Sequence, residues 1–238
     1  MMSLPFFYID QDNFESDLLV LGEETSKHVV QVLRMKEGDQ MYLTNGKGIL
    51  LTVSISEAHK KKAVVKMLAQ QTFQPSLKKV TMAVSLLKNP SRLEWFLEKA
   101  AELGVYQIIP LLCERTEKMQ FRKDRAQQIL ISAMLQSRQT FLTQLMDPVK
   151  TATLLSSDII SSFDQKWIAH CVEGNKQTIS EVAAVGKNII MLIGPEGDFT
   201  EKEITDAIKQ GFQQVSLGNN RLRTETAALT AAAVLCIQ

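Results

Sequence analysis

Continuous apolar runs alternate with segments of helical periodicity from residue 80 to the carboxyl terminus. Residues 80–87, VTMAVSLL, are apolar at nearly every position, which is typical of a strand buried on both faces of a parallel sheet. Predicted strands lie at 80–87, 106–113, 166–172, 187–193 and 212–217, and predicted helices at 91–103, 124–135, 178–184, 200–210 and 225–237. Strands separated by helices predict an α/β fold with a parallel sheet in this part of the chain.

Two of these helices carry start and stop signals. Residues 91–94 (SRLE) and 200–203 (TEKE) fit the capping box, in which a Ser or Thr side chain and a Glu side chain satisfy backbone N–H groups of the first turn. Gly104 and Gly211 follow the last periodic residues, and glycine readily adopts the left-handed conformation that ends a helix. We therefore expect Ser91 and Thr200 to cap these helices.

The first 70 residues instead show short apolar runs that suit strands. These runs are 17–22, 40–45, 49–57 and 62–68. Asn45-Gly46 separates two of them and is a strong hairpin signal, because both residues tolerate a positive φ. A helix is expected at 24–33, and the polar residues 71–76, with Pro75, read as a linker. The pattern predicts a small, mostly β, barrel-like domain.

The composition describes a folded chain whose charge is unevenly distributed. Its 238 residues are 45% hydrophobic, with no cationic leader and no apolar run long enough for a bilayer, so we expect a cytoplasmic protein without a membrane partner. The net charge is only +1, yet residues 76–150 hold 12 basic and 7 acidic side chains. Residues 1–75 hold 8 and 9, and residues 151–238 hold 7 and 10. A locally basic middle can attract RNA although the total is nearly neutral.

The cysteines and histidines stand apart from one another in the sequence. They are Cys113, Cys171 and Cys236, and His28, His59 and His170. No CxxC pair occurs, and no histidine has a companion at metal-ligand spacing. We expect three buried, reduced thiols and no metal.

Three neighbouring loops near the carboxyl terminus suit a ligand held by backbone groups. The chain contains no GxGxxG, GxxxxGK[ST], GxSxG or HExxH motif. Instead, IIMLIGPEG and QVSLG both end a predicted strand in glycine, and NNRLRTET opens the final helix. Gly194, Gly197 and Gly218 would let a flat purine with its ribose approach the backbone closely. Ordinary strand-to-helix turns are the alternative for each loop taken singly.

Several of these segments resemble one known family. IGPEGDFTEKEI, SLGNNRLRTETAAL, and EKAAELGVYQIIP followed by ERT are similar to the RsmE family of bacterial ribosomal RNA methyltransferases, in the SPOUT superfamily. HVVQVLRMKEGD resembles the PUA-like RNA-binding segment of that family. The resemblance implies a PUA-like β-barrel domain over residues 1–72 and a SPOUT α/β methyltransferase domain over residues 73–238.

The resemblance carries further implications for fold, partner and activity. Family members are homodimers whose carboxyl-terminal chain forms a deep trefoil knot, an exception to the rule that chains do not knot. They bind S-adenosylmethionine in that knot and methylate N3 of a uridine in 16S rRNA, near the decoding region of the 30S subunit. The cofactor-binding residues on the matching positions are Leu192, Ile193, Gly194, Pro195, Glu196, Gly197, Ser216, Leu217, Gly218, Leu222, Arg223, Thr224, Thr226 and Ala227.

Methylation of uracil N3 requires a base and stabilisation of an anion. N3 carries a proton at neutral pH, so the enzyme must remove that proton and align N3 with the methyl group. The resulting charge spreads onto the two carbonyl oxygens, where a guanidinium would stabilise it. Arg223 is the candidate for this task, and Glu225 and Glu196 are candidates for the base. Either glutamate could instead only interact with the dipole at the start of a helix. Arg223 could instead form a structural ion pair across a dimer.

Basic side chains in both parts of the chain are candidates for RNA phosphate contacts. They are Arg34, Lys36, Arg115, Lys118, Arg122, Lys123, Arg125 and Arg138. Arg138 departs from the family pattern: the family often has an acidic residue before Gln-Ser-x-Arg, whereas Leu135 precedes Gln136-Ser137-Arg138 here. The alternative is that these charged side chains only face the solvent and do not contact RNA.

Two other functions remain open from the sequence. The same cofactor would also serve methylation of another rRNA or tRNA position, or of a ribose 2′-OH. A catalytically silent RNA-binding module that assists ribosome assembly is a different class, and the intact GPEG and LRTETA segments argue against it.

Overall fold

The computed structural model describes residues 4–14, 16–174, 176–182 and 188–237. The chain divides into two compact units. Unit 1 comprises Met1–Pro75 and Met134–Leu142, and unit 2 comprises Ser76–Ala133 and Thr143–Gln238. A segment from the middle of the sequence thus belongs to the amino-terminal unit.

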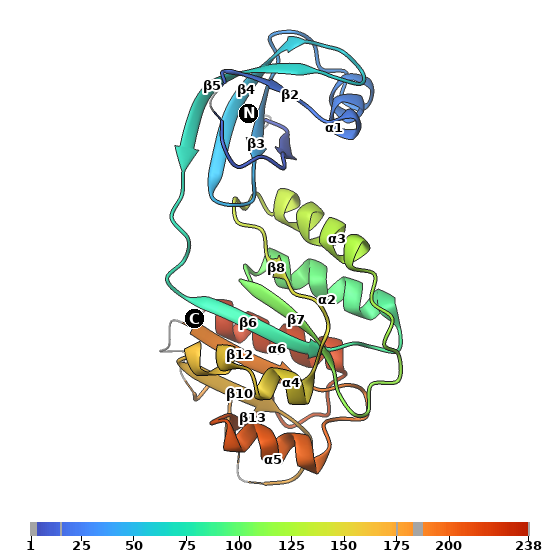
Figure 1. Cartoon of the computed structure of the whole chain (residues 1–238), viewed down its shortest axis with the longest axis vertical. Helices are drawn as coiled ribbons and strands as arrows, with labels where there is room; N and C mark the ends of the chain where they lie inside the picture. The colour runs from blue at the N-terminus through green and yellow to red at the C-terminus, as the bar shows by residue number, and fades with distance from the viewer. Residues whose placement is uncertain (1–3, 15, 175, 183–187, 238) are drawn as a thin grey trace. The chain divides into compact units, whose positions relative to one another are not determined.

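Unit 2 is built on an eight-stranded sheet whose pairs of strands are all parallel over the described residues (Figure 1). The strands are β6 (Lys79–Ser85), β7 (Gln107–Leu112), β8 (Gln144–Leu145), β9 (Val149–Lys150), β10 (Gln165–Ala169), β11 (Gln177–Thr178), β12 (Asn188–Ile193) and β13 (Gln213–Ser216). Their order is β11-β13-β10-β12-β6-β7-β8, with β9 also paired to β7. The predicted α/β fold with a parallel sheet is confirmed.

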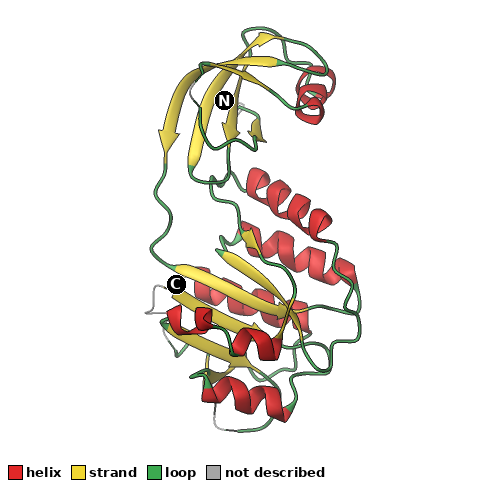
Figure 2. Ribbon diagram, viewed as in Figure 1, coloured by secondary structure: helices red, strands yellow, loops and turns green. Residues whose placement is uncertain are grey.

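Helices cover both faces of this sheet (Figure 2). The helices are α2 (Pro90–Glu102), α3 (Lys123–Gln136), α4 (Thr151–Leu155), α5 (Glu201–Lys209), α6 (Thr224–Ile237) and the 3-10 helix η2 (Asp158–Ser162). Helix α6 packs against α2, β6 and β12. On the other face, α4, η2 and α5 share an apolar core with the central strands. No helix in the described ranges is both long enough and apolar enough to span a membrane.

The first turns of α5 and α2 compare a predicted helix cap that forms with one that is replaced by a neighbouring residue. Helix α5 has the predicted capping box, with Thr200 and Glu203 bonded reciprocally. The predicted cap at Ser91 is wrong. Asn89 caps α2 by accepting from the Ser91 N–H, and Pro90 occupies the first helical position. Asn is a strong N-cap residue and Pro has the backbone φ of a first helical turn, so together they place the cap two residues before Ser91.

The helix predicted at 178–184 is also wrong over its described part. Gln177 and Thr178 form β11, which pairs with Val215 and Ser216 of β13, and the chain then turns through residues 179–182. Residues 183 and 184 lie outside the described residues. A free sheet edge offers backbone hydrogen bonds that the local sequence does not reveal, and these override helical periodicity. Strands β8 and β9 and helix α4 were not predicted.

Unit 1 holds a five-stranded sheet of order β1-β3-β4-β5-β2. The strands are β1 (Phe6–Tyr8), β2 (Leu18–Val20), β3 (Gln40–Thr44), β4 (Ile49–Glu57) and β5 (Val64–Thr72). The predicted strands are confirmed, while β1, parallel to β3, was not predicted. The expected helix at 24–33 is two pieces, α1 (Glu23–Lys27) and a π-helical turn, η1 (His28–Val32). Strand β5 continues to Thr72, so the segment predicted as a linker begins later than residue 71.

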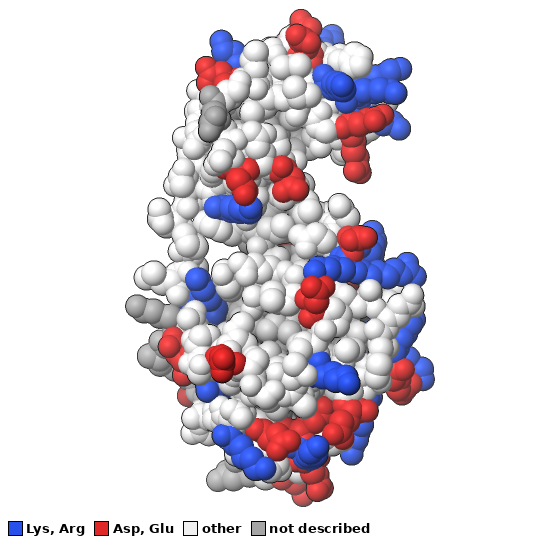
Figure 3. Space-filling model, viewed as in Figure 1, with Lys and Arg blue, Asp and Glu red and all other residues white. Residues whose placement is uncertain are grey.

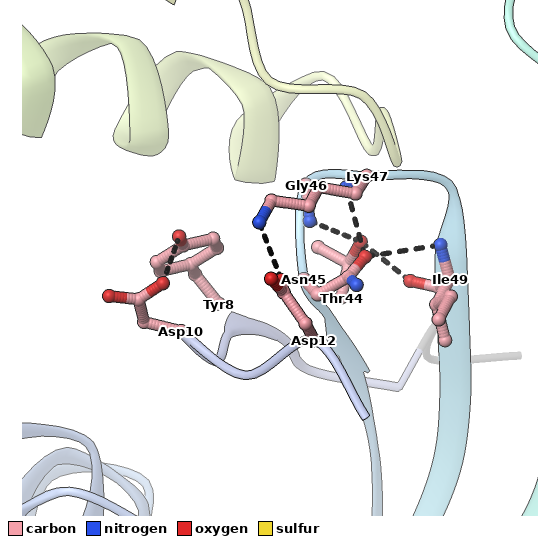
Figure 4. A network of polar contacts seen from close by, with 8 residues as sticks. All are labelled: Tyr8, Asp10, Asp12, Thr44, Asn45, Gly46, Lys47 and Ile49. Carbon is pink, nitrogen blue, oxygen red and sulfur yellow. Dashed lines mark hydrogen bonds and ion pairs between the residues drawn. The ribbon is translucent and has the colours of Figure 1, made fainter. Parts of the chain in front are cut away.

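The loop between β3 and β4 is held by side chains at its own ends (Figure 4). Asn45 is buried, and its Oδ1 accepts from the backbone N–H groups of Lys47 and Ile49 at 2.9 and 3.2 Å. Thr44 Oγ1 donates to the carbonyl oxygen of Ile49 at 2.8 Å. The hairpin predicted from Asn45-Gly46 is confirmed, but residues 45–48 form the loop and Gly48 also has a positive φ of 93°.

Replacing Gly48 by alanine is expected to lower the free energy of unfolding by about 2–4 kcal/mol, because backbone strain and overpacking add. A Cβ at Gly48 would lie 2.6 Å from Phe141 Cζ and 2.8 Å from the Phe73 carbonyl oxygen. Gly38 has a similar φ of 88° with no atom within 4 Å of its Cβ position. Gly38→Ala therefore isolates the strain, at about 1–2 kcal/mol. Urea unfolding compares the two variants, and equal losses would contradict the steric argument.

Candidate functional site

The three loops predicted near the carboxyl terminus converge on one cleft of about 660 Å³ in unit 2. It opens at the carboxyl ends of β12, β10 and β13, which are neighbours in the sheet. Ligands of open α/β sheets bind at this edge. The cleft is lined by Ala169–Cys171, Lys176, Ile193–Glu196, Asp198, Val215–Thr224 and Ala227.

The predicted cofactor residues line this cleft with three exceptions. Leu192 is fully buried in β12 and belongs to the apolar core. Gly197 faces away, toward Arg115, whose Cβ lies 3.4 Å from the position of a Cβ at residue 197. Thr226 is exposed on the first turn of α6.

Two glycines of the cleft are required by local geometry. A Cβ at Gly194 would lie 3.0 Å from Phe199 Cδ2 and 3.1 Å from the Phe199 backbone nitrogen. Gly218 has a φ of 125°, which L side chains rarely adopt, although no atom lies within 4 Å of its Cβ position. Side chains at these positions would therefore distort the backbone that forms the cleft walls.

The three candidate catalytic residues are not all brought together. Arg223 and Glu196 line the cleft, and Glu196 Oε1 accepts from the Lys88 backbone N–H at 3.1 Å. Glu225 does not line it. Its Oε1 lies 3.6 Å from Arg92 Nε, and its buried Oε2 has no hydrogen-bond partner among the described residues. The structure thus places Glu196, and not Glu225, on the same cleft as Arg223.

The carboxyl end of β10 contributes cleft residues that the sequence did not single out. His170, Cys171 and Lys176 line the cleft from beyond β10, and Asp198 lines it from the loop after β12. His170 Nε2 lies 2.8 Å from Gln214 Oε1, and its buried Nδ1 has no hydrogen-bond partner among the described residues. Burial lowers the pKa of His170, and the nearby Lys176 cation lowers that pKa further. Strand β10 was predicted, but its place between β12 and β13 was not.

The lowered pKa of His170 predicts a stability that falls in acid. Because the folded pKa lies below that of the unfolded chain, about 6.5, the unfolded state binds more protons as the pH drops through this range. His170→Gln should therefore reduce the loss of Tm between about pH 7 and about pH 5. His59→Gln, in a loop of unit 1, is the matched control. The same acid sensitivity in His170→Gln as in the wild type would contradict the assignment.

The predicted RNA-binding residues are distributed over both units, and several have protein partners. Lys123 pairs with Asp147 at 2.7 Å and Arg125 with Glu94 at 3.4 Å. Arg34 and Arg138 belong to unit 1 and have positive φ values of 54° and 56°. Lys36 also lies in unit 1, and Lys118 and Arg122 line a second, smaller pocket of unit 2. Figure 3 shows acidic side chains as well as basic ones on the face drawn.

The cysteines do not indicate metal or disulfide chemistry. Burial raises the pKa of Cys113 and of Cys236 to about 11, so both thiols stay protonated at neutral pH. Cys171 is exposed and Cys236 is half-buried, so the expectation of three buried thiols holds only for Cys113. Within the described ranges, no three His, Cys, Asp or Glu side chains gather in a way that could hold a metal ion.

Two family models match the chain and together span most of it. The description "RNA methyltransferase domain" applies to residues 74–236 and "RNA methyltransferase PUA domain" to residues 21–68. Ribosomal RNA small subunit methyltransferase E of Rickettsia conorii is 30% identical over 235 residues, which cover 95% of this chain and 92% of that protein.

Solved structures of similar proteins share the fold along almost the whole chain. The crystal structure of a probable rRNA-methyltransferase from Porphyromonas gingivalis has a TM-score of 0.89 at 34% identity, covering 98% of this chain and 99% of that one. Ribosomal RNA small subunit methyltransferase E from Neisseria gonorrhoeae, bound to S-adenosylmethionine, has a TM-score of 0.83 at 27% identity. That match covers 97% of this chain and 96% of the other.

Proposed function

Because this chain belongs to the family of ribosomal RNA small subunit methyltransferase E, the RsmE family, we propose that it methylates N3 of a uridine in 16S rRNA near the decoding region. Its membership of this family, expected from the sequence motifs, is confirmed. The chain is an S-adenosylmethionine-dependent rRNA methyltransferase with an amino-terminal PUA-like domain. The target atom, the target region and the residue roles below are our proposals.

The convergence of three loops on one cleft carries this proposal. The cleft volume of about 660 Å³ lies in the range of small-molecule and cofactor sites. Backbone groups around Gly194 and Gly218 would hold the adenosine, since neither position has a Cβ in the way. When bound, S-adenosylmethionine supplies a methyl group on a sulfonium, which is already electrophilic.

The chain's own residues then have two tasks at the uracil ring. We assign proton removal from N3 to Glu196, because it lines the cleft while Glu225 lies outside it, paired with Arg92. We assign stabilisation of the negative charge on the uracil oxygens to the Arg223 guanidinium, which lines the same cleft. The contact between Glu196 and the Lys88 N–H would orient the carboxylate for this role.

The RNA would be held by basic residues outside the cofactor cleft. Neutralised phosphates release counterions, so we expect RNA affinity to fall steeply with added salt. Arg115 is left out of this group, because its guanidinium donates to the Gly197 carbonyl oxygen. The residues that we propose for this role are Arg34, Lys36, Lys118, Arg122, Lys123, Arg125 and Arg138. An affinity that does not change with salt would remove them from the interface.

Three features of organisation complete the proposal. We propose a PUA-like RNA-binding domain over residues 1–72 and a SPOUT methyltransferase domain over residues 73–238. We also propose that the final segment forms a deep trefoil knot and that the protein acts as a cytoplasmic homodimer. Light scattering of the purified protein tests the dimer, and a monomer mass would contradict it.

The decisive experiment offers labelled S-adenosylmethionine together with 30S subunits that lack the modification. Incorporation of label, followed by mass mapping of the methylated nucleoside, should identify 3-methyluridine in 16S rRNA. The same assay with free 16S rRNA in place of the subunits determines whether the assembled subunit is the substrate. Label at another nucleotide or on a ribose 2′-OH would replace the proposed target. Failure to bind the cofactor, even with RNA present, would favour a silent RNA-binding module.

A further inference from the structure

Loop 194–199, which forms one wall of the cleft, is tied to the ends of neighbouring strands on both sides. Beyond β6, the Lys88 backbone N–H donates to Glu196 Oε1 at 3.1 Å. Beyond β7, the Arg115 guanidinium donates to the Gly197 carbonyl oxygen at 2.8 Å. Beyond β10, the Cys171 backbone N–H donates to Asp198 Oδ2 at 2.7 Å. Because β12 lies between β6 and β10, these contacts hold the loop from both directions.

Arg115 makes the most extensive of these contacts. Its guanidinium also approaches the Phe199 carbonyl oxygen at 3.5 Å. Its stem lies against Gly197, where an added Cβ would be 3.4 Å from Arg115 Cβ and 3.5 Å from Cδ. The arginine stem therefore lies close against the loop backbone at Gly197.

The backbone next to Arg115 is itself anchored. The buried Glu203 side chain accepts from the Glu114 backbone N–H at 3.0 Å and also completes the capping box of α5. Cys113 and Thr116 close a turn, in which the Cys113 N–H donates to Thr116 Oγ1 at 2.9 Å. The segment that carries Arg115 is thus held at both ends, and its guanidinium acts from a defined position.

We propose that Arg115 is a positioning residue that holds loop 194–199 in the shape that binds the cofactor, and that it is not a ligand of RNA phosphate. One terminal nitrogen of its guanidinium, Nη1, donates to both the Gly197 and the Phe199 carbonyl oxygen of the loop. A loop ordered before the ligand arrives loses less entropy on binding, so the arginine raises cofactor affinity without touching the cofactor. This inference rests on the proposed function, because it takes loop 194–199 as part of the S-adenosylmethionine site.

The test measures cofactor and RNA affinity separately in the full-length protein. Calorimetry with Arg115→Ala should show a Kd for S-adenosylmethionine raised about tenfold, because a hydrogen bond from a charged group is lost. At saturating cofactor, kcat should stay within about threefold of the wild type. Arg115→Lys, which can still donate to one carbonyl, should regain part of the affinity. Lys202→Ala, an exposed lysine on α5, should leave both affinities unchanged.

RNA binding distinguishes the two roles of Arg115. The salt dependence of binding to 30S subunits should be the same for Arg115→Ala as for the wild type. Unchanged cofactor affinity, or a salt slope reduced by about one unit, would overturn the proposal. If Arg115→Ala does not fold, Arg115→Gln replaces it, because glutamine also lacks the guanidinium. Wild-type cofactor affinity in that variant would overturn the proposal. A wild-type chain that binds no S-adenosylmethionine would instead refute the proposed function.

Discussion

Arg223→Ala is expected to lower kcat by about 100- to 1000-fold while the Kd for S-adenosylmethionine changes by less than about threefold. Arg223 lines the cofactor cleft and is the last residue of the loop before α6. Its guanidinium would stabilise negative charge that is present only after N3 has lost its proton, so its loss should affect the transition state far more than the ground state. Single-turnover methyl transfer and calorimetry measure the two quantities independently.

Arg223→Lys provides the matched comparison. Lysine keeps the charge but lacks the planar fork that can bond two acceptors, so an intermediate kcat is expected. Unchanged turnover in Arg223→Ala would remove Arg223 from the mechanism. A loss of cofactor affinity with normal turnover at saturation would reassign it to cofactor binding.

Glu196→Gln is expected to lower kcat by about 100- to 10,000-fold, the usual contribution of a general base. Glutamine can still accept from the Lys88 N–H, so the loop contact at 3.1 Å is retained and the base is removed. The deficit should shrink at alkaline pH, where uracil N3 loses its proton without assistance. A rate profile of both proteins against pH checks this, since a purely structural defect would not be relieved by alkali.

Glu225→Gln is the comparison for that experiment. Glu225 is buried beside Arg92 and outside the cleft lining, so its substitution should affect stability more than turnover. The opposite pattern, with normal turnover in Glu196→Gln and a large loss in Glu225→Gln, would transfer the role of base to Glu225.

Much of the fold follows from local patterns that were readable in the sequence. Strand β4 has the predicted bounds Ile49–Glu57, and α5 has the predicted cap at Thr200. The glycine loops after β12 and β13 were recognisable because glycine at a strand end is a local requirement of the backbone. The prediction failed at two places in particular. Asn89, and not Ser91, caps α2, and residues 177–178 form a strand because they pair with β13.

What the sequence determined by itself was the family, the α/β class and the loops that would form a cofactor site. Only the tertiary structure determined which further side chains lie in the cleft beside these loops. Strand order places β10 between β12 and β13, so His170 and Cys171 enter the cleft. Folding likewise brings Arg115 onto a loop 82 residues away and pairs Glu225 with Arg92 outside the cleft. Periodicity and capping act over a few residues, whereas the neighbour of a strand is chosen by burial and hydrogen bonding between segments far apart in the chain.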